Sequence, residues 1–219
     1  MKSTMKIISI NTGTAQEIKD YHGKAFVSAI GKSSILLPTY LGKLGLQGDE
    51  CVEDCHGGAE MALHLFCYDH YAFFNEKAGF ELPNGAFGEN ISISGYSEKE
   101  ANVGDVLQLD DALIQVTQPT ERCRTIGRSL GLPKLLKWIH LEMMTGLYLR
   151  VLEPGTISVT PKVRLVERGD ELLNIASLND LMFNNYDLGK LQQVCQQKLL
   201  NQAWKERAFI HYQRAGFSL

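Results

Sequence analysis

The sequence predicts a mainly β protein, a barrel or sandwich of short strands, with a few interspersed helices and a small C-terminal α-helical bundle. Two observations lead to this fold class. Up to about residue 168, short β-type runs are divided by Gly, Pro, Asn and Asp. Beyond that point the β-branched runs disappear, and apolar residues recur at helical spacing. We therefore place a domain boundary between residues 1–168 and residues 169–219.

The predicted strands are short and rich in β-branched residues. They cover residues 7–10, 27–30, 62–66, 91–94, 106–109, 113–117, 146–151, 157–159 and 163–166. The residues Asp110-Asp111-Ala112 separate two of these strands. This spacing predicts a tight hairpin in which Ile114 and Val116 share one face.

Two helices are expected to interrupt the strands. One covers residues 69–78 and stops at Gly79. The other begins at Pro133, a good residue for a first helical turn. Its apolar residues have helical spacing: Leu135, Leu136, Ile139 and Met143.

The C-terminal segment is predicted to form about three helices, the first around residues 178–183. In the second, Asp187 is a suitable N-cap. The apolar face behind it consists of Leu188, Leu191, Cys195 and Leu199. The third helix holds Trp204, Ala208 and Tyr212. Because Cys195 belongs to an apolar stripe, we interpret it as a core residue. So small a bundle is expected to dock on the β domain.

Composition and charge argue against several classes of protein. With 44% apolar and 21% charged residues, the chain is close to the average for soluble globular proteins. A net charge of −3 disfavours binding to nucleic-acid polymers or to anionic membranes. The first apolar run ends at Asn11, too early for a signal sequence, and no run approaches the roughly 20 residues of a membrane span. We expect a cytoplasmic protein with reduced thiols.

A glycine-rich loop, residues 45–58, ends in His56-Gly57-Gly58. Consecutive glycines let backbone N–H groups approach a ligand closely, and the histidine adds a titratable donor or metal ligand. A plain turn is an equally good interpretation. Cys51, Cys55 and His56 also suggest zinc, although a structural zinc site needs four ligands and no second close pair follows.

A second loop, residues 84–90, precedes the strand at 91–94. Glu89 and Asn90 place an acid and an amide where this strand begins, behind a turn between Gly85 and Gly88. The pattern fits a ligand site or a simple turn with a satisfied asparagine. Farther along, Arg150 lies in an apolar strand, where its guanidinium needs an anionic ligand or a carboxylate in a structural ion pair.

The third loop, residues 118–124, follows the strand at 113–117. Pro119 ends that strand and leaves Cys123 between Arg122 and Arg124. Positive charge beside a thiol favours the thiolate, which is the reactive and metal-binding form. We therefore interpret Cys123 as a functional residue. A thiolate combined with imidazole, arginines and glycine loops would suit a phosphate-bearing cofactor that carries a metal.

Together these loops resemble the MOSC domain family, named for the C-terminal domain of molybdenum cofactor sulfurase. The resemblance covers about residues 6–167 and rests on an ordered set of motifs: Gly23-Lys24, Ser28-Ala29-Ile30, Gly48-Asp49, His56-Gly57-Gly58, Ala62-Leu63-His64, residues 85–90, Val103-Gly104-Asp105, Gln118-Pro119 with Cys123, and residues 146–151. The tail resembles the three-helix extension of the YiiM-like branch. The resemblance implies a closed or partly closed β-barrel over residues 1–168 and a three-helix subdomain over residues 169–219.

The resemblance also implies a cofactor and a reaction. The molybdenum cofactor (molybdopterin) would have its metal ligated by Cys123. The residues implied around the pterin and phosphate are His56, Gly57, Gly58, Glu89, Asn90 and Arg150. The implied activity is a reductase of N-hydroxylated amines or nucleobase analogues of the hydroxylaminopurine type, with electrons from a flavin-containing reductase. The catalytic candidates are then Cys123, with His56 and Glu89 for proton transfer.

Two alternatives remain open. A non-enzymatic carrier of sulfur or of molybdenum cofactor would use the same thiolate, and a zinc-stabilised binding module would use Cys51, Cys55 and His56. The chain also departs from the family pattern close to Cys123. Members usually carry Arg after Gln-Pro and Pro directly before the cysteine, whereas Thr120 and Arg122 stand there in this chain. The oligomeric state is left open.

Overall fold

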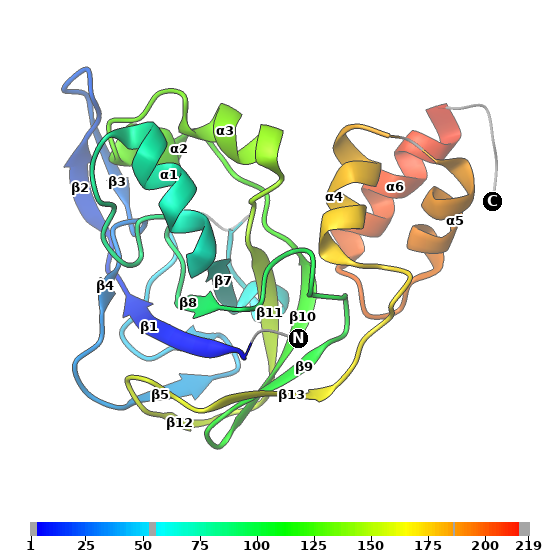
Figure 1. The fold of residues 1–219 in the computed structure, drawn as a ribbon, viewed down its shortest axis with the longest axis horizontal. Helices are drawn as coiled ribbons and strands as arrows, with labels where there is room; N and C mark the ends of the chain where they lie inside the picture. Colours follow the sequence, from blue (N-terminus) through cyan, green and yellow to red (C-terminus); the bar gives the residue numbers. More distant parts are fainter. Residues whose placement is uncertain (1–3, 53–55, 186, 215–219) are drawn as a thin grey trace.

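A curled eight-stranded sheet forms the centre of the protein (Figure 1). The computed structural model describes residues 4–52, 56–185 and 187–214. The strands lie in the order β13-β9-β10-β11-β7-β8-β1-β4; β7 and β8 run parallel, and the other neighbours are antiparallel. The strands are β1 (Lys6–Thr12), β4 (Ser33–Ser34), β7 (Leu63–Cys67), β8 (Ile91–Ser94), β9 (Val106–Leu109), β10 (Ala112–Pro119), β11 (Leu147–Glu153) and β13 (Val163–Glu167). The predicted mainly β fold is confirmed, as a partly closed barrel.

The predicted hairpin joins β9 to β10. Leu109 pairs with Ala112, and Asp110 adopts a φ of 47°, a left-handed conformation that Asp tolerates better than most residues. The Asp110 carboxylate accepts hydrogen bonds from the Ser158 N–H at 2.9 Å and from the Lys162 N–H at 3.0 Å. These bonds tie the hairpin to the segment that leads into β13.

Two smaller sheets accompany the main one. β12 (Gly155–Ile157), β5 (Thr39–Gly42) and β6 (Gly45–Leu46) form the first, and β2 (Gln16–Lys19) and β3 (Ala25–Ser28) form a separate hairpin. The strand predicted at residues 157–159 ends at Ile157, and the one predicted at 27–30 ends at Ser28. Sequence reasoning misses β2, β4, β5 and β6, because these segments of two to four residues contain no run of β-branched residues.

Helices α1 (Tyr71–Ala78), α2 (Thr125–Ser129) and α3 (Leu135–Glu142) cover one end of the barrel (Figure 1). Two shorter helices, η2 (Ala59–Met61) and η3 (Tyr68–His70), follow the glycine-rich loop and strand β7. Gly79 ends α1 as predicted, with a φ of 79°. Met143 is not part of α3, contrary to expectation; it caps the helix with a φ of 54°. A separate apolar cluster, which includes Phe66 stacked on Phe87 with ring centroids 4.1 Å apart, lies beneath α1 and α3.

The C-terminal helices α4 (Ile175–Phe183), α5 (Leu188–Gln196) and α6 (Gln202–Arg214) lie together beside the barrel (Figure 1). Asp187 caps α5 as predicted, because its carboxylate accepts a hydrogen bond from the Lys190 N–H at 3.0 Å. Leu199 lies between α5 and α6 rather than on a helical face. None of the helices in the described ranges is both long and apolar enough to cross a bilayer.

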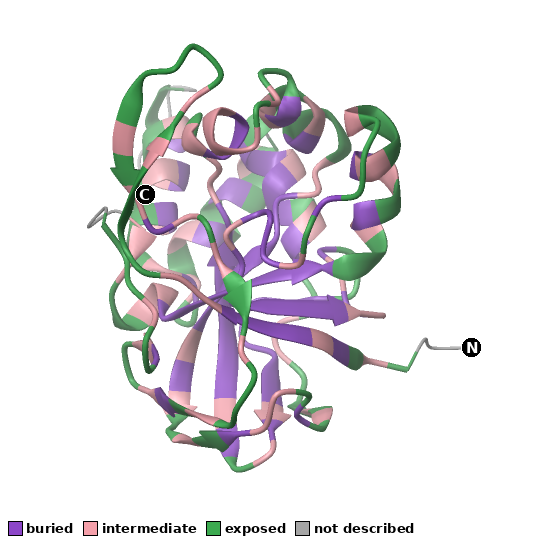
Figure 2. Ribbon diagram, turned by 90° about the vertical axis from the view of Figure 1, so that its left-hand side faces the viewer, coloured by how far each residue is buried: buried purple, intermediate pink, exposed green. Residues whose placement is uncertain are grey.

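One hydrophobic core extends from the sheet into these helices. Figure 2 shows buried residues concentrated along the strands. The cluster that contains Ile114 and Leu149 of the sheet also contains Leu178 of α4 and Trp204 of α6. Cys195 packs, partly buried, against the same cluster. The core therefore does not divide at residue 168.

Candidate functional site

A cavity of 310 Å³ brings the three predicted loops together. This volume lies at the lower end of the range for small-molecule sites. The cavity is formed by the glycine-rich loop, the loop at residues 84–90, strand β3 and the Cys123 loop, which we define as residues 120–124. Five of the predicted site residues line it: His56, Gly57, Gly58, Asn90 and Cys123. Other polar residues of the lining are Ser28, Lys32, Asp49, Glu50, Cys51, His64, Thr120, Glu121, Arg122, Thr125, Arg128 and Tyr148.

The Cys123 thiol ionises more readily than an ordinary thiol. A hydrogen bond from His56 is the largest cause, and the hydroxyl and N–H of Thr125 add to it. Against the opposing effect of partial burial, these donors lower the pKa of Cys123 to about 6. The leading causes are therefore His56 and Thr125, and not the flanking arginines that the sequence pattern suggests. Cys123 is therefore mostly thiolate at neutral pH.

His56 connects the thiol to the barrel wall. Its Nδ1 lies 3.3 Å from the hydroxyl of Tyr148 on β11. The two following glycines keep the backbone close to the cavity. A Cβ on Gly57 would approach the Cys51 Sγ to 3.3 Å, and Gly58 has a φ of 97°, which residues with a side chain rarely adopt.

Arg122 has a role that the sequence does not reveal. Its side chain donates from Nε to the Thr145 carbonyl at 2.8 Å and from Nη1 to the Phe87 carbonyl at 2.7 Å. Its Nη2 lies 2.7 Å from the Nε2 of His64. Because a guanidinium can only donate, the Nε2 of His64 accepts this bond. Burial, followed by the charge of Arg122, keeps the pKa of His64 well below its usual value, so the ring is neutral.

Asn90 joins the cavity wall to an ion pair. Its Nδ2 donates to Asp49 Oδ2 at 2.8 Å, and its Oδ1 accepts from the His64 N–H at 3.0 Å. Asp49 in turn pairs with Lys32. Both polar atoms of Asn90 are thus bonded within the protein. This arrangement matches the satisfied asparagine that the sequence left as an alternative.

Arg128 of α2 lies against the β2–β3 hairpin at the cavity, and several apolar side chains line the cavity beside it. The Arg128 guanidinium lies 4.0 Å from the ring centroid of Phe26, and its Nε lies 3.2 Å from Asp20 Oδ2. Apolar side chains of the lining remain exposed: Val27 by 56%, Leu44 by 76% and Val52 by 43%. This part of the cavity therefore offers a ligand a cationic contact from Arg128 and apolar contacts from these exposed side chains.

Glu89 lies away from the cavity, which corrects the expectation that it lines the cofactor pocket. Its fully buried carboxylate accepts hydrogen bonds from the hydroxyls of Tyr71 at 2.6 Å and Ser92 at 2.7 Å. The N–H groups of Phe87 and Gly85 donate to it at 3.0 and 3.2 Å. Burial raises the pKa of Glu89, and these donors oppose the rise. The turn at residues 85–88 folds back onto the carboxylate, so Glu89 holds the turn together.

Replacing Glu89 by Gln should therefore destabilise the protein by about 1–3 kcal/mol, because the new amide N–H₂ would face groups that themselves donate. Urea denaturation measures this loss. Glu76→Gln, at an exposed position on α1, is the matched control and should stay within about 0.5 kcal/mol of the parent. If Glu89→Gln matched that control, the buried network around the carboxylate would not have the strength its geometry indicates.

Arg150 also lies away from the cavity, contrary to the expectation that it lines the cofactor pocket. Its Nη2 is 3.2 Å from Glu60 Oε2 and donates to the Leu199 carbonyl. The guanidinium thus joins η2 to the segment between α5 and α6. This contact is the structural ion pair that the sequence left open. Sequence spacing gives no indication that Glu60 is the partner.

The zinc hypothesis depends on Cys55, which lies outside the described residues. Its other two ligands, Cys51 and His56, both line the cavity. Within the described ranges, no three side chains from His, Cys, Asp and Glu gather in a group that could hold a metal ion.

The fold and the cavity define a class of protein, a partly closed β-barrel with a readily ionised cysteine in a cavity built from loops. The chain belongs to the MOSC domain family, whose model matches residues 52–172. It is 33% identical over 167 residues to "Protein YiiM" of Escherichia coli (strain K12), covering 74% of this chain and 72% of that protein. The crystal structure of YiiM from Geobacillus stearothermophilus has a TM-score of 0.81 and 28% identity, covering 95% of this chain and 100% of that chain. The YiiM-like branch is thereby confirmed.

A fungal relative carries a functional name. A protein named "Reductase" from Gibberella moniliformis (strain M3125 / FGSC 7600) is 32% identical over 150 residues. The match covers 67% of this chain but 27% of that protein, so it concerns one part of a longer chain.

Proposed function

We propose that this MOSC protein binds the molybdenum cofactor through Cys123 and reduces N-hydroxylated amines or nucleobase analogues. The observation that carries the proposal is the Cys123 thiol, which lines the cavity, is hydrogen-bonded by His56 and has a pKa of about 6. A thiolate available at neutral pH is the type of ligand that soft metals select. The name of the Gibberella relative supports the reaction class.

The cavity has donors that fit a phosphate-bearing pterin. Thr120 lines the cavity, and its buried Oγ1 has no hydrogen-bond partner among the described residues. Because buried polar atoms are nearly always paired, such an atom marks a place for a ligand atom. Lys32 and Arg128 bring cationic groups to the lining, each beside its carboxylate partner (Asp49 and Asp20), and Gly57 brings its backbone. Cys123 would hold the metal, and these cationic and backbone groups would hold the anionic part.

Reduction of an N-hydroxylated amine breaks the N–O bond and consumes two electrons and two protons, yielding the amine and water. The cofactor, when bound, would supply the two electrons, and a flavin-containing reductase would replace them. His56 would deliver a proton, because it contacts both the Cys123 thiol and the Tyr148 hydroxyl at the cavity wall. The exposed side chains of Val27 and Leu44 would contact the apolar part of the substrate.

The test is the molybdenum and pterin content of protein made in a host with an intact cofactor pathway. Molybdenum is measured by elemental analysis and pterin by the fluorescence of its oxidised form. We expect Cys123→Ser to lose roughly nine-tenths or more of the metal, because a hydroxyl replaces the soft thiolate ligand, and to keep the parent's unfolding temperature. Cys51→Ser, which removes another thiol from the same cavity, should retain it. Equal metal in Cys123→Ser and the parent would contradict the role of Cys123.

Turnover separates a reductase from a carrier. With a flavin-containing reductase, a nicotinamide donor and an N-hydroxylated substrate, a reductase oxidises one donor for each substrate reduced. Protein that holds the cofactor but consumes no reducing equivalents would be a carrier, and the reductase proposal would be rejected. Zinc that persists in Cys123→Ser but disappears in Cys55→Ser would instead indicate the zinc-stabilised module.

A further inference from the structure

Helix α6 contacts the loop that carries Cys123. Arg207 on this helix forms two parallel bonds with Glu121, from Nη1 to Oε1 at 2.8 Å and from Nη2 to Oε2 at 2.9 Å. Glu121 lines the cavity two residues before Cys123. A bidentate pair of this kind sets the orientation of both side chains. With exposed fractions of 38% and 41%, the pair itself adds little to global stability.

Arg207 has a second contact, with Trp204 one turn earlier on the same helix. Its guanidinium lies 5.9 Å from the ring centroid of Trp204, which is 1% exposed and belongs to the core shared with the barrel. The helix that presents Arg207 is therefore anchored on the barrel independently of Glu121. A side chain on a fixed helix can restrain a loop even when the ion pair is weak, because the helix does not move with the loop.

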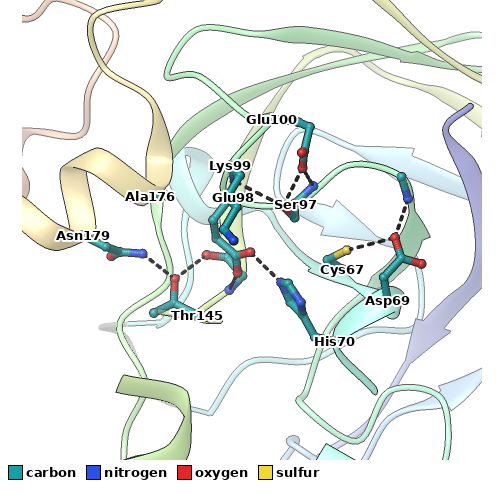
Figure 3. Close-up of polar contacts among 12 residues, drawn as sticks. Cys67, Asp69, His70, Ser97, Glu98, Lys99, Glu100, Thr145, Ala176 and Asn179 are labelled. Carbon is teal, nitrogen blue, oxygen red and sulfur yellow. Dashed lines mark hydrogen bonds and ion pairs between the residues drawn. The ribbon is translucent and has the colours of Figure 1, made fainter. Parts of the chain in front are cut away.

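Helix α4 reaches the residues that support the same loop (Figure 3). Asn179 donates from Nδ2 to Thr145 Oγ1 at 2.9 Å, and the Ala176 N–H donates to the Glu98 carbonyl at 2.9 Å. The Oε1 of Glu98 accepts the Gly146 N–H at 2.6 Å. The turn formed by Thr145 and Gly146 is thus held from the helical side.

The Thr145-Gly146 turn accepts hydrogen bonds from two residues of the Cys123 loop. The Gly146 carbonyl accepts the Thr120 N–H at 3.0 Å, and the Thr145 carbonyl accepts the Nε of Arg122 at 2.8 Å. Thr120, Glu121 and Arg122 therefore each have a separate anchor directly before Cys123. Thr120 and Arg122 are held by the Thr145-Gly146 turn, whereas Glu121 is held by Arg207 of the C-terminal helix α6.

We propose that Arg207 is a positioning residue for Cys123, and that through Glu121 it holds the Cys123 loop against the cavity so that the C-terminal helices form part of the site. This inference rests on the proposed function in one respect, the use of Cys123 as the cofactor ligand. The helices would act through the loop, since none of the cavity's lining residues comes from the described parts of α4, α5 or α6.

Hydrogen–deuterium exchange of residues 120–124 and the molybdenum content test this proposal together. In Arg207→Met we expect exchange in the loop to accelerate roughly threefold or more, because the loop opens locally, and molybdenum content to fall by a similar factor. Arg207→Lys should restore part of both, because a lysine keeps the charge but not the two parallel bonds. Arg214→Met, at an exposed position on the same helix, is the matched control and should change neither.

A double-variant comparison strengthens the test. Glu121→Gln and the Glu121→Gln, Arg207→Met double variant should show the same faster exchange as Arg207→Met, because one anchor is lost in each. Additive effects would overturn the proposal, as would unchanged exchange in Arg207→Met at an unchanged unfolding temperature. If the parent itself held no molybdenum, the proposed function would fail, and the exchange rates alone would still decide whether Arg207 positions the loop.

Discussion

Replacing His56 by alanine is expected to raise the pKa of Cys123 from about 6 towards that of an ordinary thiol, about 8.5. The hydrogen bond from His56 is the largest cause of the low pKa, and without it partial burial opposes only the donors of Thr125. Iodoacetamide reacts with the thiolate. In the parent, alkylation should therefore persist down to a pH of about 6 and be lost below it. In His56→Ala the loss should begin at a higher pH.

The expected change is large enough to measure directly. At pH 6 the alkylation rate of Cys123 should fall roughly fivefold to tenfold, since the smaller thiolate fraction is partly offset by the higher nucleophilicity of a more basic sulfur. Cleavage after Glu121 and Glu142 isolates the Cys123 peptide for mass spectrometry. His22→Ala, in the exposed turn between β2 and β3, is the control and should leave the profile unchanged. An unshifted midpoint in His56→Ala would show that another group sets the acidity of Cys123.

Gly146→Ala should cost about 4 kcal/mol of unfolding free energy. A Cβ at this position would lie 2.5 Å from His64 Nε2, 2.7 Å from the Leu65 carbonyl and 3.2 Å from Arg122 Nη2. Two of these neighbours are backbone or buried ring atoms with no room to retreat. Gly146 also has a φ of 76°, which is strained for any residue with a side chain. Strain and overpacking each cost about 1–3 kcal/mol, and here they act together.

Gly131 separates these two costs. It has a similar φ of 69°, but a Cβ there would meet no atom within 4 Å. Gly131→Ala should therefore lose only about 1 kcal/mol, the cost of the left-handed backbone alone. Urea denaturation of both variants gives the comparison. If Gly146→Ala lost no more than Gly131→Ala, the close packing of His64 and Arg122 around Gly146 would be refuted.

The elements that sequence reasoning located well are those whose signal is local. The strands β8 and β9 have the predicted bounds, because Ile91 and Ile93 mark the first, three apolar residues mark the second, and turn residues flank both. The cap at Asp187 and the stop at Gly79 also depend on neighbours within one turn. The two-residue strand β4, by contrast, exists only through its pairing with Asn11 and Thr12, about 20 residues away. Such a strand leaves no periodicity in the sequence.

The site shows the same division. The pattern around Cys123 and His56 identifies residues that the fold does bring into one cavity. The sequence pattern does not place Arg150 and Glu89 correctly, because the sequence does not show which group a charged side chain contacts in the fold. Glu60 lies 90 positions before Arg150, and the groups that satisfy Glu89 include the Tyr71 hydroxyl from another element. Arg122 directly precedes Cys123 in the sequence, but its guanidinium donates to the Thr145 and Phe87 carbonyls and not to the thiol.

The core shared by the barrel and the C-terminal helices also bears on how the chain folds as it is made. A ribosome completes residues 1–168 before Leu178 and Trp204, which belong to the same core, have emerged. Until then the apolar surface of β10 against which α4 packs faces water. Nascent chains with such a surface are prone to aggregate and are substrates for chaperones. The core of the barrel in this protein is thus completed only by residues translated after it.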